Sequence, residues 1–98
     1  MENIAYSGII DRSFQLFAGL RGLVESAITQ CVSINPSYDR GEYRSEAYMA
    51  CLDGLHKYSL EPDDPAHARR ALKMFTLETL VFWHIKKRLC QMATYERF

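Results

Sequence analysis

Residues 64–92 read DPAHARRALKMFTLETLVFWHIKKRLCQM, and this stretch decides the fold class. Asp64 is a favourable N-cap residue, and Pro65 follows at the first helical position, where its missing N–H costs nothing. Mainly apolar residues then recur every three or four positions, which predicts one helix over about 64–96. The row comprises Ala68, Ala71, Phe75, Glu78, Phe82, Ile85, Leu89 and Met92. The middle of the helix, Leu77 to Trp83, is apolar nearly all round, so we expect it to be covered on every side.

Glu78 is the charged member of this row. A carboxylate that faces a core is costly unless it is paired. Two interpretations stay open. In one, the helix turns Glu78 to the rim of the core, where an arginine of another helix pairs with it. In the other, Glu78 forms an ion pair with a partner chain.

Two short polar stretches contain all three prolines and separate this helix from two earlier helical segments. The first segment covers about 6–34 and carries a broad apolar stripe at three-four spacing. The second covers about 39–58, where Asp39 followed by Glu42 resembles a capping box. No segment alternates as a strand would. We therefore predict a single all-α domain over residues 1–98, with two long helices and one short helix in a bundle-like arrangement.

The helix lengths raise the question of what covers the long helices. At 1.5 Å per residue the long helices span roughly 40–50 Å and the short one about 27 Å. Part of each long apolar stripe would then stay exposed, and a helical-bundle homodimer is the simplest cover. The interface candidates are Phe14, Phe17, Phe82, Trp83, Ile85 and Leu89.

The alternative to a dimer is a kink in the first helix. Gly19 and Gly22 lie inside it, and each costs about 1 kcal/mol relative to alanine. A kink there would fold the first helix back into a compact four-helix monomer. The row Ala18, Gly22 and Ser26 is also compatible with a close contact between two helices.

Charge divides the chain into an acidic part and a basic part. Residues 1–65 carry five Lys/Arg against ten Asp/Glu, whereas residues 66–98 carry seven against two. The last helix is therefore a basic rod beside an acidic body, and we expect the two to attract each other. The candidate charged surface consists of Arg69, Arg70, Lys73, Lys86, Lys87 and Arg88.

No spacing in the sequence indicates a cofactor, a metal site or a catalytic site. His67 and His84 would lie roughly 25 Å apart on one helix, too far to share a metal ion. The three cysteines, Cys31, Cys51 and Cys90, form no metal or redox motif, and each lies on an apolar or partly apolar stripe. We therefore expect structural, unreactive thiols, no cofactor, no metal and no enzymatic activity.

The sequence favours a non-catalytic protein–protein interaction module. Such a module would be a small adaptor, inhibitor or regulator that presents a helical, charged surface to another protein. The odd cysteine count and the absence of a signal peptide or membrane span favour the cytoplasm. The alternative is a nucleic-acid-binding accessory protein that uses the basic third helix. A small enzyme or ligand-binding bundle is a third class, with no motif in its favour.

Overall fold

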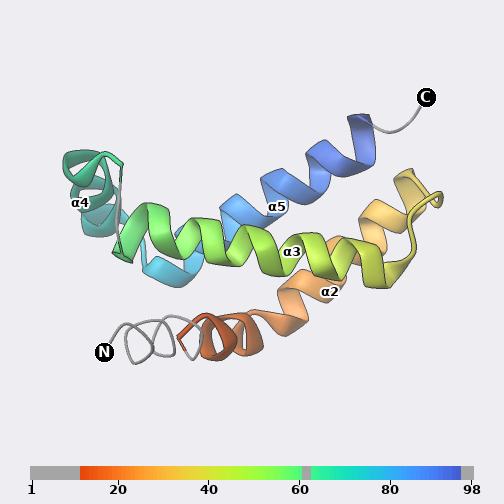
Figure 1. Ribbon diagram of the computed structural model, residues 1–98, viewed down its shortest axis with the longest axis horizontal. Coiled ribbons are helices and arrows are strands. Elements are labelled where there is room, and N and C mark those ends of the chain that lie inside the picture. The colour runs from red at the N-terminus through yellow and green to blue at the C-terminus, as the bar shows by residue number, and fades with distance from the viewer. Residues whose placement is uncertain (1–11, 61–62, 96–98) are drawn as a thin grey trace, which may run out of the picture.

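The computed structural model describes residues 12–60 and 63–95, and within them the chain forms helices joined by short connections, without strands (Figure 1). The all-α prediction is confirmed. Residues 12–19 form an N-terminal helical segment. It is followed by α2 (Arg21–Ile34), α3 (Arg40–Leu55), the π-helix η1 (His56–Leu60), α4 (Pro65–Met74) and α5 (Leu77–Tyr95).

The two predicted helix starts are confirmed in their capping geometry. At α3, an Asp39 carboxylate oxygen accepts the backbone N–H of Glu42, whose own carboxylate accepts the N–H of Asp39. At α4, Asp64 accepts the N–H of His67, with Pro65 in the first turn. Both caps satisfy N–H groups that have no partner within the helix, which fixes where each helix begins.

The first long helix is interrupted, which corrects the continuous helix predicted over 6–34. Leu20 leaves helical geometry (φ −93°, ψ 0°) between residues 12–19 and α2. Its side chain is buried, whereas Gly19 and Gly22 have open space where a Cβ would lie. The break thus occurs at the position that the kink alternative named, because two weak helix formers flank a leucine that the core buries. Residues 6–11 of the prediction lie outside the described residues.

The helix predicted over 64–96 is also two helices, so the three-helix count is not confirmed. Phe75 is extended (φ −137°, ψ 153°) and ends α4. Thr76 then caps α5, because its Oγ1 accepts the N–H of Thr79 at 3.2 Å and its carbonyl accepts that of Leu80 at 3.1 Å. A threonine at an N-cap competes with helix continuation, and this local hydrogen bond supports the break. Residue 96 lies outside the described part of the chain.

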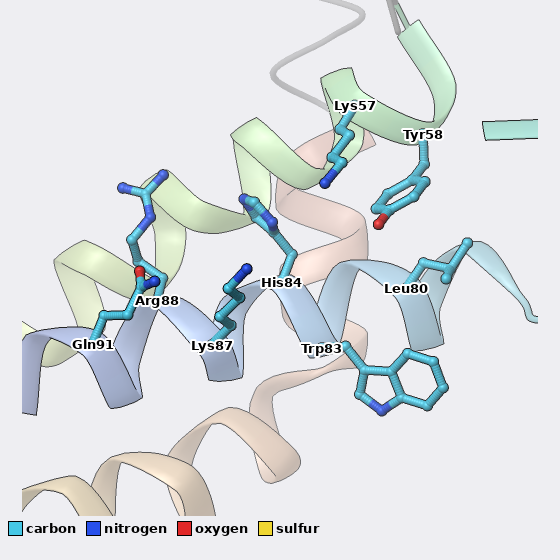
Figure 2. A pocket seen from close by; sticks show the side chains of 8 residues that line it. All are labelled: Lys57, Tyr58, Leu80, Trp83, His84, Lys87, Arg88 and Gln91. Atoms are coloured by element: carbon cyan, nitrogen blue, oxygen red, sulfur yellow. The ribbon is translucent and has the colours of Figure 1, made fainter. Parts of the chain in front are cut away.

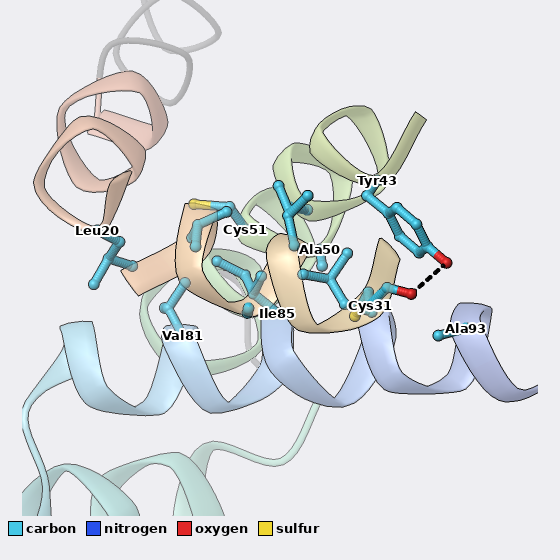
Figure 3. Close-up of a cluster of buried hydrophobic side chains, with 13 residues drawn as sticks. Leu20, Cys31, Tyr43, Ala50, Cys51, Val81, Ile85 and Ala93 are labelled. Carbon is cyan, nitrogen blue, oxygen red and sulfur yellow. Dashed lines mark hydrogen bonds between the residues drawn. The ribbon is translucent and has the colours of Figure 1, made fainter. Parts of the chain in front are cut away.

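The core lies where α2, α3 and α5 meet, and α3 and α5 have the most extensive contact (Figure 3). The core residues of α5 are Val81, Ile85, Leu89 and Ala93, all of which are fully buried. On α3 the facing residues are small: Ala47, Ala50, Cys51 and Gly54. A Cβ built on Gly54 would lie 3.4 Å from Val81 Cγ1. The small residues of α3 therefore let the two helix backbones approach closely.

Asn35 joins three helices at the far end of the core. Its Nδ2 donates to the carbonyl of Ala93 at 3.2 Å, and its Oδ1 accepts the backbone N–H of Ser37 at 3.1 Å. Its carbonyl accepts the hydroxyl of Tyr43 at 2.8 Å. Asn35 is buried, so these bonds satisfy polar groups that water does not reach. One residue thus ties the turn after α2 to α5 through its side-chain amide and to α3 through its backbone carbonyl.

The two breaks remove the argument that led to the homodimer prediction. With the first and last helices each divided, α4 does not extend the line of α5 but lies beyond the C-terminal end of α3 (Figure 1). The remaining lengths of α2, α3 and α5 pack against one another, while Leu23, Ile34 and Met49 stay exposed. The homodimer stays a prediction. None of the helices in the described part of the chain combines the length and apolarity needed to cross a membrane.

Candidate interaction surface

The junction between α4 and α5 exposes two aromatic side chains that touch each other. The rings of Phe75 and Trp83 meet edge to face, with centroids 4.8 Å apart. Phe75 is 40% exposed and Trp83 is 48% exposed. Aromatic residues are enriched at the centres of protein interfaces because they bury large apolar areas. We call this pair the aromatic patch.

A groove of about 280 Å³ lies beside the aromatic patch, between η1 and α5 (Figure 2). Lys57 and Tyr58 of η1 form one side of it. The other side comes from α5, which contributes Leu80, Trp83, His84, Lys87, Arg88 and Gln91. The helical spacing of three and four brings these α5 residues onto one face. Trp83 belongs to both the patch and the groove, so the two form one continuous surface.

The groove has a cationic lining. Arg88 is locally compensated, because it pairs with Glu46 at 3.1 Å and also with Asp53. Lys57 Nζ lies 5.5 Å from the centre of the Tyr58 ring. Within the described part of the chain, neither Lys57 nor Lys87 forms an ion pair with a carboxylate. The groove therefore offers two ammonium groups to whatever approaches from outside.

His84 lies between these cations. Figure 2 shows Lys57 and Lys87 approaching it from opposite sides. Burial of the imidazole lowers the pKa of His84 most, and the charges of Lys57 and Arg88 lower it further. The charge of Asp53 raises this pKa by more than the charge of Lys87 lowers it. Its Nε2 is buried and has no hydrogen-bond partner among the described atoms. The surroundings of His84 thus favour the neutral form of its imidazole.

A second hollow, of about 580 Å³, adjoins the groove and shares Lys57, His84 and Arg88 with it. It also receives His56 and His67. The predicted separation of His67 and His84 is therefore wrong, because the break at Phe75 turns α4 and brings both histidines to one hollow. No group of three or more His, Cys, Asp or Glu among the described residues has the arrangement of a metal site.

The predicted interface residues are divided between core and surface. Ile85 and Leu89 are fully buried within the chain, which removes them from any surface, because Thr76 sets a rotation of α5 that turns them to α3. Phe17 and Phe82 are partly buried against the core. Trp83 and Phe14 are exposed, and Phe14 packs on Tyr48 with ring centroids 5.3 Å apart. The structure does not bring Phe14 to the aromatic patch by any described contact.

The predicted charged surface is likewise divided. Arg69, Arg70, Lys73, Lys86 and Lys87 are exposed. Arg88 instead faces the acidic α3 and forms the expected attraction between basic helix and acidic body. A further pair of contacts lies within the acidic part itself, where Arg40 and Arg44 both bind Glu25 at 2.7 and 2.8 Å. The hydrogen bonds from Arg44 and then Arg40 lower the pKa of Glu25 from 4.5 to about 2.

Glu78 is exposed at the rim of α5, as one interpretation expected, and lines a shallow hollow with Arg12. Among the described residues no ion pair with Glu78 is present. Of the cysteines, Cys31 and Cys51 are buried, and burial raises both thiol pKa values, that of Cys51 to about 11. Cys90 is exposed, so the expectation of three core thiols is wrong for Cys90.

Sequence reasoning missed Lys57, Tyr58 and His84 as a unit. The spacing of Leu80, His84 and Lys87 places these three on one helix face, but no signal in the sequence indicates that Lys57 and Tyr58 pack beside them. Comparisons of the chain with protein-family models, curated proteins and solved structures find no match. The functional argument therefore comes from the geometry of this surface.

Proposed function

We propose that this chain is a non-catalytic protein–protein interaction domain that works as a small adaptor, inhibitor or regulator. The observation that carries the proposal is the aromatic patch, Phe75 and Trp83, exposed beside a groove with two lysines that form no ion pair within residues 12–60 and 63–95. An apolar centre with a charged rim is the usual composition of a protein interface. The partner binds through this surface, and the core of α2, α3 and α5 holds it in place.

Two further features support a binding role over catalysis. Burial raises the pKa of the Cys31 and Cys51 thiols, which works against either acting as a thiolate nucleophile. The groove is also near the lower end of the roughly 300–1,000 Å³ typical of small-molecule sites. Its volume of about 280 Å³ suits one or two side chains of a partner. Three free cysteines make a reducing compartment such as the cytoplasm the expected location.

Site-specific photocrosslinking in cells tests the proposal. A photoreactive phenylalanine analogue replaces Trp83 in one variant and Ser45, an exposed residue of α3, in the matched control. We expect a protein adduct at position 83 that is absent or much weaker at position 45. The adduct should disappear when Phe75→Ala is combined with the crosslinker, because this change removes half of the aromatic patch.

The other outcomes identify the alternatives. An adduct between two copies of the chain would support the homodimer prediction and assign its interface to α4 and α5. A nucleic-acid adduct would replace the proposal with the accessory-protein alternative, in which exposed aromatics stack on bases beside basic residues. Equal labelling from positions 83 and 45 would contradict a specific surface at the junction.

A further inference from the structure

We propose that the groove between η1 and α5 accepts an acidic segment of the partner protein, with a carboxylate between Lys57 and Lys87 and an apolar side chain over Leu80 and Trp83. This inference deepens the proposed function and depends on it. It names the chemistry of the partner: an extended or helical segment that carries Asp or Glu next to a large apolar residue.

Charge complementarity selects the acidic partner. Among the described residues, the groove lining contains three cations and no carboxylate, and Glu46 and Asp53 already hold Arg88. The adjoining hollow, which shares Lys57 with the groove, is also lined by Asp53, Asp63 and Asp64. Lys57 and Lys87 remain for an external anion. A carboxylate between them relieves the repulsion of two like charges and gains two charge-assisted hydrogen bonds.

The apolar part of the groove lining favours a protein segment, and not a free anion, as the ligand. Leu80 forms a buried part of the groove lining, and Trp83 is about half exposed at its edge. Tyr58 continues this apolar contact on the η1 side. An isolated anion would leave the exposed parts of Trp83 and Tyr58 in water, whereas a neighbouring apolar side chain removes them from it. A segment that supplies both groups uses the whole groove.

His84 couples binding to protonation. A carboxylate near Lys57 and Lys87 offsets the charges that oppose an imidazolium at His84, so the bound segment should raise the pKa of this histidine. The other titratable or charged groups that line the same hollows are Asp53, His56, Asp63, Asp64, His67 and Arg88. Because linkage is reciprocal, the chain with a protonated His84 should bind the acidic segment more tightly than the chain with a neutral His84.

A titration of the purified chain with a short blocked peptide of glutamate and leucine tests the proposal. Trp83 is the one tryptophan in the sequence, so its fluorescence reports directly from the groove. We expect saturable binding of this peptide and no binding of a lysine and leucine peptide of the same pattern. Lys57→Gln and Lys87→Gln should each weaken binding about fivefold, the ratio for one charge-assisted contact.

Lys86→Gln is the matched control, because it removes the same charge one position along α5 but does not line the groove. It should weaken binding less than about twofold, through screened long-range attraction alone. Equal effects of Lys86→Gln and Lys87→Gln would overturn the proposal in favour of non-specific attraction. Displacement of the peptide by a single-stranded oligonucleotide would overturn it in favour of nucleic acid.

NMR titration of the histidine ring protons gives the second readout. The pKa of His84 should rise on saturation with the acidic peptide, while inorganic phosphate at equal charge should leave the Trp83 signal unchanged. A protein adduct at position 83 in cells, together with no peptide binding and no change at His84, would retain the proposed function and overturn the acidic segment. Absence of the adduct in cells, together with intact peptide binding, would overturn the proposed function and retain the acidic-segment specificity of the groove.

Discussion

The sequence predicts α4 and α5 as one helix, but the two helices differ in how much of their apolar surface is buried. α5 buries Leu80, Val81, Ile85, Leu89 and Ala93 between its neighbours. In α4, all of whose residues are described, Ala68 is the buried residue, and Leu72 is 40% exposed. A ring contact between Tyr58 and His67 supplements this small contact. Stability therefore comes from α5, while the surface available to a partner lies at its junction with α4.

The largest expected difference between the two helices is in the cost of removing an apolar side chain. Ile85→Ala should lower the free energy of unfolding by about 2–5 kcal/mol, because it leaves a cavity in a fully buried site. Leu72→Ala, on α4, should lower it by less than about 1 kcal/mol, because the side chain is already partly hydrated. Urea unfolding followed by circular dichroism measures both. Comparable losses would mean that α4 belongs to the core.

Substitutions at Gly54 test how closely α3 approaches α5, and we expect their effect on the free energy of unfolding to be intermediate in size. Gly54→Leu should cost about 1–3 kcal/mol, because the added atoms meet Val81 and His84 where even a Cβ would be 3.4–3.5 Å away. Gly54→Ala, the control, should be neutral or stabilise by up to about 1 kcal/mol, since alanine is the better helix former. Thermal unfolding compares them. A well-tolerated leucine would show that α5 can move away from α3.

The smallest expected effect concerns Glu25, whose pKa of about 2 lies below its ordinary 4.5. A lowered carboxylate pKa stabilises the fold above pH 4.5, and this contribution is lost as the pH falls from 4.5 toward 2. Since Arg40 and Arg44 are largely exposed, we expect this contribution to the free energy of unfolding to be about 1 kcal/mol. Unfolding free energies across this pH range should show that loss in the parent and not in Glu25→Gln.

Glu78→Gln is the matched control for the Glu25 experiment. It removes a carboxylate that belongs to none of the ion pairs among the described residues. It should therefore retain the loss between pH 4.5 and 2 that the parent shows. If Glu25→Gln retained the same loss as well, the contact of α2 with α3 would not depend on these ion pairs.

The helix caps were predictable from the sequence, and so was the site of a kink near Gly19 and Gly22 as one of two alternatives, whereas the break at Phe75 was not. The caps at Asp39 and Asp64 use side chains within three residues of the groups they satisfy, so the sequence pattern suffices to find them. The break at Phe75 depends on a competition between continued helix and the Thr76 cap, and packing of α5 on α3 decides it. The groove depends on the packing of η1 against α5, which are far apart in the sequence, so its residues could not be grouped before that packing was known.

Asn35 has a consequence for the chemical durability of the protein. Asparagine deamidates when the backbone nitrogen of the next residue attacks the carbonyl carbon of the side-chain amide and closes a succinimide ring. The next residue here is Pro36, whose nitrogen carries no hydrogen and cannot complete this reaction in the usual way. Deamidation would replace the Nδ2 donor to Ala93 with an anionic oxygen facing a carbonyl. The proline therefore protects from this deamidation the side-chain amide that joins the turn after α2 to α5.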